Sequence, residues 1–226
     1  LMLFVLPRRA LPRGILGFAV AAAAVLAFFA VATQGSLSFL ANQQSRGLQV
    51  ESVGALPYLL FDLAGGDVAY GYVYGSFQVL MSGVEAVGIV ATLAGLLLLG
   101  LLAWRRLAGR LEGVAPGDVA FAVMLVAVAS SRVYSPQFNV WLIGLGAVAL
   151  LDPRTRMRAP VAIMVAVSIV TQVVYPWSGT QLVSGGPSAI IPQALVVLGL
   201  LAALVLALAS VLRPTASTDR LPAAPR

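Results

Sequence analysis

Long apolar stretches separated by shorter polar connections dominate the pattern of this chain. A helix that crosses a membrane needs about 20 mostly apolar residues, and about six stretches reach or approach that length. They cover residues 15–33, 84–104, 118–131, 136–151, 160–177 and 190–212, of which the third and fourth are short. The pattern predicts an all-α, polytopic membrane protein with a transmembrane helical bundle over residues 1–212.

The connection over residues 34–83 is by far the longest, and long connections in compact domains are usually functional. It is too apolar for a solvated loop, so we expect helices that lie in the membrane interface or dip back into the bilayer. Tyr70, Tyr72 and Tyr74 recur there at every second position. An interfacial aromatic belt is the interpretation we favour, and a platform for a sugar is the alternative.

The two ends of the chain differ from the predicted spans. Residues 1–6 form an apolar run that looks like the end of an earlier helix, so we expect this sequence to be the C-terminal part of a longer protein. No signal peptide is recognisable at the start. Residues 213–226 are rich in Pro, Ala, Ser and Thr, which predicts a disordered tail.

Composition supports the membrane assignment and limits the chemistry. The chain is 60% hydrophobic and 10% charged, against roughly 25% charged residues in a soluble domain. It has no cysteine and no histidine, which excludes disulfides and removes the commonest zinc ligand and general base. Glu51, Asp62, Asp67 and Glu85 have no diagnostic ligand spacing, so we predict no cofactor and leave a divalent metal open.

The distribution of arginine predicts the orientation in the membrane. All 14 basic residues are arginines, and all but Arg46 and Arg132 lie before the first stretch or in alternate connections and the tail. By the positive-inside rule these arginine-rich segments are cytoplasmic. We therefore expect a multi-pass protein of the plasma membrane with residues 34–83 outside and a cytoplasmic C-terminus. The net charge of +6 comes from arginines that serve this orientation. It therefore does not indicate nucleic-acid binding, and we expect no nucleic acid as a partner.

A candidate anion site lies in the short outer connection over residues 131–135. Ser135 followed by Pro136 is the pattern of an N-cap and a first helical residue, so we expect a helix to begin there. Its unpaired N–H groups carry partial positive charge, to which Arg132 adds a full charge. A lipid phosphate would fit this place; the alternative is that Arg132 only snorkels to water beside an ordinary transmembrane helix.

A second polar motif lies within the long outer connection, over residues 46–52 (Arg-Gly-Leu-Gln-Val-Glu-Ser). Arg46 could pair with a phosphate or orient Glu51. Gln49 and Ser52 suit sugar hydroxyls. The alternative is an Arg46–Glu51 ion pair that holds a loop together.

Together, the two motifs resemble a family of bacterial integral-membrane enzymes. Residues 46–52, followed by Tyr134-Ser135-Pro136-Gln137-Phe138 and Trp141, are similar to the pattern of the GT-C type, polyprenol-phosphate-mannose-dependent mannosyltransferases of glycosyltransferase family 87. The resemblance covers residues 1–177. Arg132 stands where the family pattern has lysine, and Phe138 replaces a tyrosine.

The resemblance implies transfer of mannose or a related sugar from a polyprenyl-phosphate donor to a glycolipid or glycan acceptor at the outer face. The substrate-binding candidates are Arg46, Gln49, Glu51, Ser52, Arg132, Tyr134, Ser135 and Gln137.

The family carries its catalytic aspartate in an N-terminal outer loop, and no position here matches it. Glu51 would contact acceptor hydroxyls or, in a self-sufficient chain, act as the base. The alternatives are a flippase or transporter of lipid or polyprenyl phosphate, and a non-catalytic membrane scaffold. Helix centres nearly free of charge count against ion-coupled transport.

Overall fold

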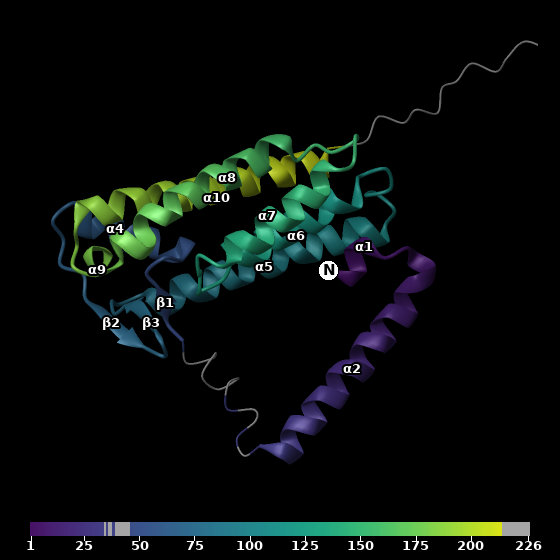
Figure 1. The fold of residues 1–226 in the computed structure, drawn as a ribbon, viewed down its shortest axis with the longest axis horizontal. Coiled ribbons are helices and arrows are strands. Elements are labelled where there is room, and N and C mark those ends of the chain that lie inside the picture. Colours follow the sequence, from purple (N-terminus) through teal and green to yellow (C-terminus); the bar gives the residue numbers. More distant parts are fainter. Residues whose placement is uncertain (34, 36–37, 39–45, 214–226) are drawn as a thin grey trace, which may run out of the picture.

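The computed structural model describes residues 1–33, 35, 38 and 46–213, and this part of the chain is mainly helical (Figure 1). The helices and helical turns are α1 (Met2–Val5), η1 (Arg8–Ala10), α2 (Leu11–Ala32), η2 (Val53–Ala55), α4 (Leu56–Leu63), α5 (Val84–Leu107), α6 (Pro116–Ala129), α7 (Phe138–Leu150), α8 (Arg158–Gln172), η3 (Val173–Trp177), α9 (Gly179–Leu182) and α10 (Pro187–Leu212). The predicted all-α class is confirmed. Residues 214–226 of the predicted tail lie outside the described residues.

Four of the described helices are long and apolar enough to cross a membrane, and they cover Arg8–Ala32, Val84–Leu107, Arg158–Trp177 and Pro187–Leu212. The chain is therefore a membrane protein. Helices α6 and α7 have 14 and 13 residues. At about 1.5 Å per residue they are shorter than a hydrocarbon core of about 30 Å, so the total of about six crossings stays a prediction.

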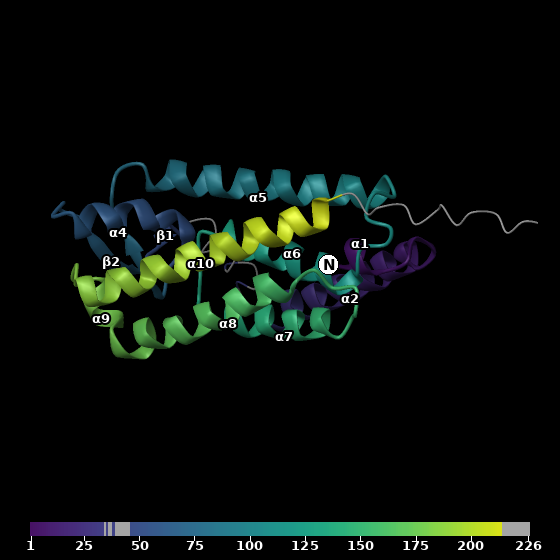
Figure 2. The ribbon, with the colours of Figure 1, turned by 90° about the horizontal axis from the view of Figure 1, so that it is seen from above.

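Helix α6 lies at the centre of the bundle, where it contacts α5, α7 and α10. Its sequence is apolar on all sides, which is typical of a buried helix, and Phe121 and Leu125 are fully buried. In Figure 2, α5 runs along one side of the bundle and α7 and α8 along the other. Helix α2 has no buried residue and diverges from the bundle (Figure 1).

Arginine-rich segments meet at one end of the bundle, which we call the arginine end. Guanidinium groups there donate hydrogen bonds to carbonyls near helix C-termini: Arg8 to Arg106 O and Leu107 O, Arg105 to Leu212 O, and Arg156 to Ser210 O. The last carbonyls of a helix lack partners within the helix and carry partial negative charge. Segments that the positive-inside rule assigned to one side of the membrane therefore also contact one another.

The opposite end of the bundle, the sheet end, carries a small sheet that the sequence did not predict. Its strands β1 (Leu48–Gln49), β2 (Tyr70–Val73) and β3 (Ser76–Val79) are antiparallel in the order β1-β3-β2. Tyr74 and Gly75, both with positive φ, form a two-residue turn between β2 and β3, as in a type I′ hairpin. The two-residue period of the tyrosines is that of a strand. Helices η2 and α4 confirm that this connection contains helices. Their expected position in the membrane interface or within the bilayer stays a prediction.

Candidate functional site

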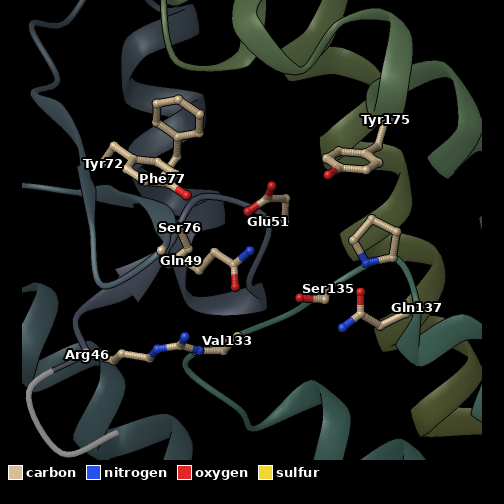
Figure 3. A pocket seen from close by; sticks show the side chains of 12 residues that line it. Arg46, Gln49, Glu51, Tyr72, Ser76, Phe77, Val133, Ser135, Gln137 and Tyr175 are labelled. Atoms are coloured by element: carbon tan, nitrogen blue, oxygen red, sulfur yellow. The ribbon is translucent and has the colours of Figure 1, made fainter. Parts of the chain in front are cut away.

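The two predicted motifs meet at the sheet end, on either side of a cavity of about 600 Å³ (Figure 3). The cavity is lined by Arg46, Gln49, Glu51, Tyr72, Gly75, Ser76, Phe77, Val133, Ser135, Pro136, Gln137 and Tyr175. Five of the eight predicted site residues are among them, namely Arg46, Gln49, Glu51, Ser135 and Gln137. The structure thus brings together polar groups that lie more than eighty positions apart in the chain.

One backbone hydrogen bond joins the two motifs, and two further hydrogen bonds fix the first motif to β3 and to α10. The N–H of Gln49 donates to the carbonyl oxygen of Arg132 at 3.0 Å, and the N–H of Val50 donates to Phe77 O at 3.1 Å. The buried side chain of Gln193, on α10, donates from Nε2 to Glu51 O at 2.9 Å. Gln193 was not among the predicted site residues, although a glutamine inside a long apolar stretch is itself a signal of a polar contact.

Three buried polar atoms of the first motif have no hydrogen-bond partner: Gln49 Oε1, Glu51 Oε2 and Ser52 Oγ. In the described part of the chain only Arg105 Nε shares this condition. Buried polar side-chain atoms almost always have partners, because leaving one unpaired costs about 1–3 kcal/mol. Two of these oxygens, Gln49 Oε1 and Glu51 Oε2, belong to side chains that line the cavity, whereas Ser52 does not line it.

Glu51 is the one carboxylate among the described residues that line this cavity. Burial raises the pKa of its carboxyl group, because a low-dielectric surrounding disfavours the charged form. The nearby backbone of Glu51 and the Gln49 side chain oppose this shift by favouring the charged form, but their effect on the pKa is smaller. A carboxylate with a raised pKa at the wall of a cavity is suited to receive a proton from a bound hydroxyl group.

Arg46 does not form the ion pair with Glu51 that we considered as an alternative. Its guanidinium donates to the carbonyl oxygen of Tyr74 at 3.1 Å, and the two ion pairs found among the described residues lie elsewhere. The hairpin turn therefore orients Arg46 at the cavity wall. The cation and the carboxylate remain separately available to a ligand.

The prediction that Ser135 caps a helix beginning at Pro136 is wrong. Helix α7 begins at Phe138, its N-cap is Gln137, and no side chain caps it. The N–H groups of Phe138 and Asn139 donate back to the carbonyls of Ser135 and Pro136 at 2.9 and 3.1 Å. Each of these hydrogen bonds goes to the residue three positions earlier and pairs an N–H group that we expected to be free. The Ser135 side chain does not cap the helix and lines the cavity instead (Figure 3).

Three predicted site residues do not line the cavity. Ser52 is fully buried. The Arg132 guanidinium packs against Gly88 of α5, where an added Cβ would lie 2.7 Å from Arg132 Nε. Tyr134 is buried and donates from its hydroxyl to Asn139 Oδ1 at 2.6 Å, and burial raises its pKa to about 12. Arg132 contributes its backbone to the site through the bond from Gln49, and Tyr134 supports the fold.

Three aromatic side chains of the cavity were not among the predicted site residues: Tyr72, Phe77 and Tyr175. Tyr72 was in the sequence analysis as part of a possible sugar platform, whereas Tyr70 is engaged elsewhere, donating to Asp62 Oδ2 at 2.6 Å. Nothing in the local sequence distinguishes Tyr175 from an interfacial tyrosine, because its approach to the cavity depends on tertiary structure.

The described residues contain no group of three or more His, Cys, Asp or Glu side chains that could hold a metal ion. Asp62, one of the carboxylates considered for such a role, accepts the hydrogen bond of Tyr70.

Comparison of the chain with protein-family models, with curated proteins and with solved structures finds no match. The resemblance of the two motifs to a glycosyltransferase family accordingly stays a prediction.

Proposed function

We propose that this chain is a membrane glycosyltransferase that uses a polyprenyl-phosphate-linked sugar, such as mannose, as its donor. The acceptor is a glycolipid or polysaccharide hydroxyl at the outer face of the membrane. The observation that carries the proposal is the group of unpartnered, buried oxygens of residues 49–52 beside a cavity of about 600 Å³. Hydrogen-bond acceptors of this kind match a substrate rich in hydroxyl groups.

The reaction assigns separate roles to the two charged groups of the cavity. The acceptor oxygen forms a bond to the anomeric carbon of the sugar as the bond from that carbon to the phosphate oxygen breaks. The polyprenyl phosphate leaves with the bonding electrons, and the proton of the acceptor hydroxyl passes to the Glu51 carboxylate. Arg46 stabilises the negative charge that grows on the leaving phosphate.

Arg46 is a better candidate for the phosphate than Arg132, which the sequence analysis placed beside the expected helix start. Arg46 lines the cavity together with Glu51, whereas Arg132 packs on α5 at Gly88. Gln137, at the start of α7, adds an amide donor on the opposite wall (Figure 3).

A lipid-linked donor also needs an apolar site for its chain, and a second cavity of about 370 Å³ adjoins the first at Pro136. It lies between α7 and α8 and is lined by Pro136, Asn139, Val140, Ile143, Gly144, Ser168 and Gln172. Because α8 and η3 together form a span long enough to cross a membrane, Arg158–Trp177, a polyprenyl chain in this groove would stay at bilayer depth while its phosphate reached the polar cavity.

The test is sugar transfer in membranes that contain the chain, with labelled polyprenyl-phosphate-mannose as donor and a glycolipid extract as acceptor. Glu51→Gln removes the proton acceptor and is expected to lower the transfer rate about 100-fold or more. Glu112→Gln removes an exposed carboxylate at the arginine end and is expected to leave the rate unchanged. Arg46→Gln is expected to lower transfer far more than Arg132→Gln.

Protein level and membrane insertion are measured for each variant, so that a loss of activity is not confused with a loss of protein. Equal loss in Glu51→Gln and Glu112→Gln would contradict the assigned site. If the wild type moves the labelled lipid between leaflets but transfers no sugar, the glycosyltransferase proposal is rejected and a flippase function is supported.

A further inference from the structure

Three aromatic rings stand exposed around the mouth of a polar cavity, on two of its walls. Tyr72 and Phe77 belong to the hairpin, and Tyr175 lies on the opposite wall, with the Glu51 carboxylate between them (Figure 3). The three residues are 67%, 37% and 56% exposed, respectively. Exposed aromatic rings are common in this chain, but these three are set apart because they line one polar cavity.

Local structure holds each ring in place. Tyr72 and Phe77 are cross-strand partners on β2 and β3, and their rings meet edge to face at 5.1 Å and 69°. This arrangement is favourable for aromatic pairs. Tyr175 has an extended backbone (φ −130°, ψ 107°) inside the turn η3. The helix is interrupted there, and the ring faces the cavity instead of following α8.

We propose that Tyr175 and the Tyr72–Phe77 pair form a clamp for a sugar ring of the acceptor, so that the acceptor is recognised as a carbohydrate. The inference rests on the proposed function, because it places the acceptor on the aromatic side of Glu51 and the donor phosphate on the side of Arg46. The axial C–H groups of a pyranose are weakly positive and pack on the negative face of an aromatic ring.

The hydroxyl groups of a sugar point outward around its ring, so a carbohydrate site needs polar partners at the edges as well as aromatic faces. The cavity offers both. Gln49 Oε1 and Glu51 Oε2 are unpartnered acceptors, and Ser135 and Ser76 add hydroxyl groups to its wall. An apolar lipid tail would leave these groups without partners. A belt that merely anchors the protein in the interface would not need aromatic rings on opposite walls of a polar cavity.

Binding of methyl α-D-mannopyranoside to the purified chain in lipid nanodiscs tests this clamp without any donor, by saturation-transfer-difference NMR. Tyr175→Ala and, on a separate element, Tyr72→Ala are each expected to weaken binding about tenfold, the effect of losing one ring contact of roughly 1.4 kcal/mol. Tyr175→Phe keeps the ring and is expected to bind within about twofold of wild type.

The matched control is Trp177→Ala, because Trp177 is an exposed aromatic two positions from Tyr175 that does not line the cavity. It is expected to leave sugar binding unchanged. Equal weakening by Trp177→Ala, unchanged binding in both tyrosine variants, or no binding by the wild type would overturn the clamp. Sugar binding that depends on Tyr175 in a protein without transfer activity would support the clamp and reject the enzyme.

Discussion

At Glu51, the demands of stability and of the proposed chemistry oppose each other. The carboxyl is largely buried, its Oε2 has no partner, and its pKa is raised by burial. Folding alone would favour a neutral residue at this position. A charged group retained in such surroundings is typical of a site whose function needs it.

The raised pKa predicts the pH dependence of transfer. A general base works in its ionised form, so the rate is expected to fall as the pH is lowered through the raised pKa of Glu51. This acid limb lies above the ordinary glutamate value of about 4.3. Initial rates measured from acidic to neutral pH show the limb in wild type, and any residual activity of Glu51→Gln is expected to lack it.

The same pKa shift has a consequence for stability. Because the pKa of Glu51 is higher in the folded protein than in the unfolded chain, protonation of Glu51 stabilises the folded state. This contribution to the free energy of unfolding is fully present below the ordinary pKa and is lost as the pH rises through the raised pKa. At neutral pH, Glu51→Gln is therefore expected to unfold at the same temperature as wild type or higher. A clear decrease in its melting temperature would mean that the lost activity reflects misfolding.

At the scale of elements, the close crossing of α6 and α7 is made possible by glycine. A Cβ added at Gly117 of α6 would lie 2.8 Å from the Cα of Ala149 on α7. Because the contact is with backbone atoms, no side-chain rotation can relieve it.

Gly117→Ala is accordingly expected to lower the free energy of unfolding by about 1–3 kcal/mol through overpacking. Gly100→Ala on α5 is the matched control, since a Cβ there meets nothing within 4 Å. Alanine is the better helix former, so this control is expected to be neutral or stabilising by up to about 1 kcal/mol. Thermal unfolding of both variants in one detergent decides the question, and equal melting temperatures would contradict the close crossing.

At the scale of the whole molecule, the bundle has two chemically different ends. Guanidinium groups gather at the arginine end, while the sheet end holds the cavity. The positive-inside rule predicts that the arginine end is cytoplasmic. The cavity would then open on the outer side, where a sugar presented on a polyprenyl lipid could reach it.

Because the chain has no cysteine, single cysteines report this orientation directly. Ser82→Cys, at the sheet end, is expected to react with a membrane-impermeant maleimide on intact cells. Glu112→Cys, at the arginine end, is expected to react only after the membrane has been opened. The reversed pattern would place the cavity in the cytoplasm and remove the proposed donor from its reach.

The sequence by itself determined the helices and their grouping. Each apolar run is a local signal, since a span must be apolar along its whole length. Helices α5, α6, α7 and α10, and the span formed by α8 with η3, begin and end close to the predicted positions, whereas the short helix α9 was not predicted. The arginines similarly indicated which connections would lie together, as their hydrogen bonds at one end now show. The two polar motifs were recognisable because polar residues are conspicuous in such a chain.

Only the tertiary structure decided which members of the motifs face one cavity. Arg46 and Arg132 look alike in sequence, yet Arg46 lines the cavity and Arg132 packs on α5. The sheet was missed because its strands are only 2 to 4 residues long, too short to show a clear pattern. Gln193 and Tyr175 reach the site from distant helices. Such contacts depend on how helices pack, which is a property of all the elements together and not of any local stretch.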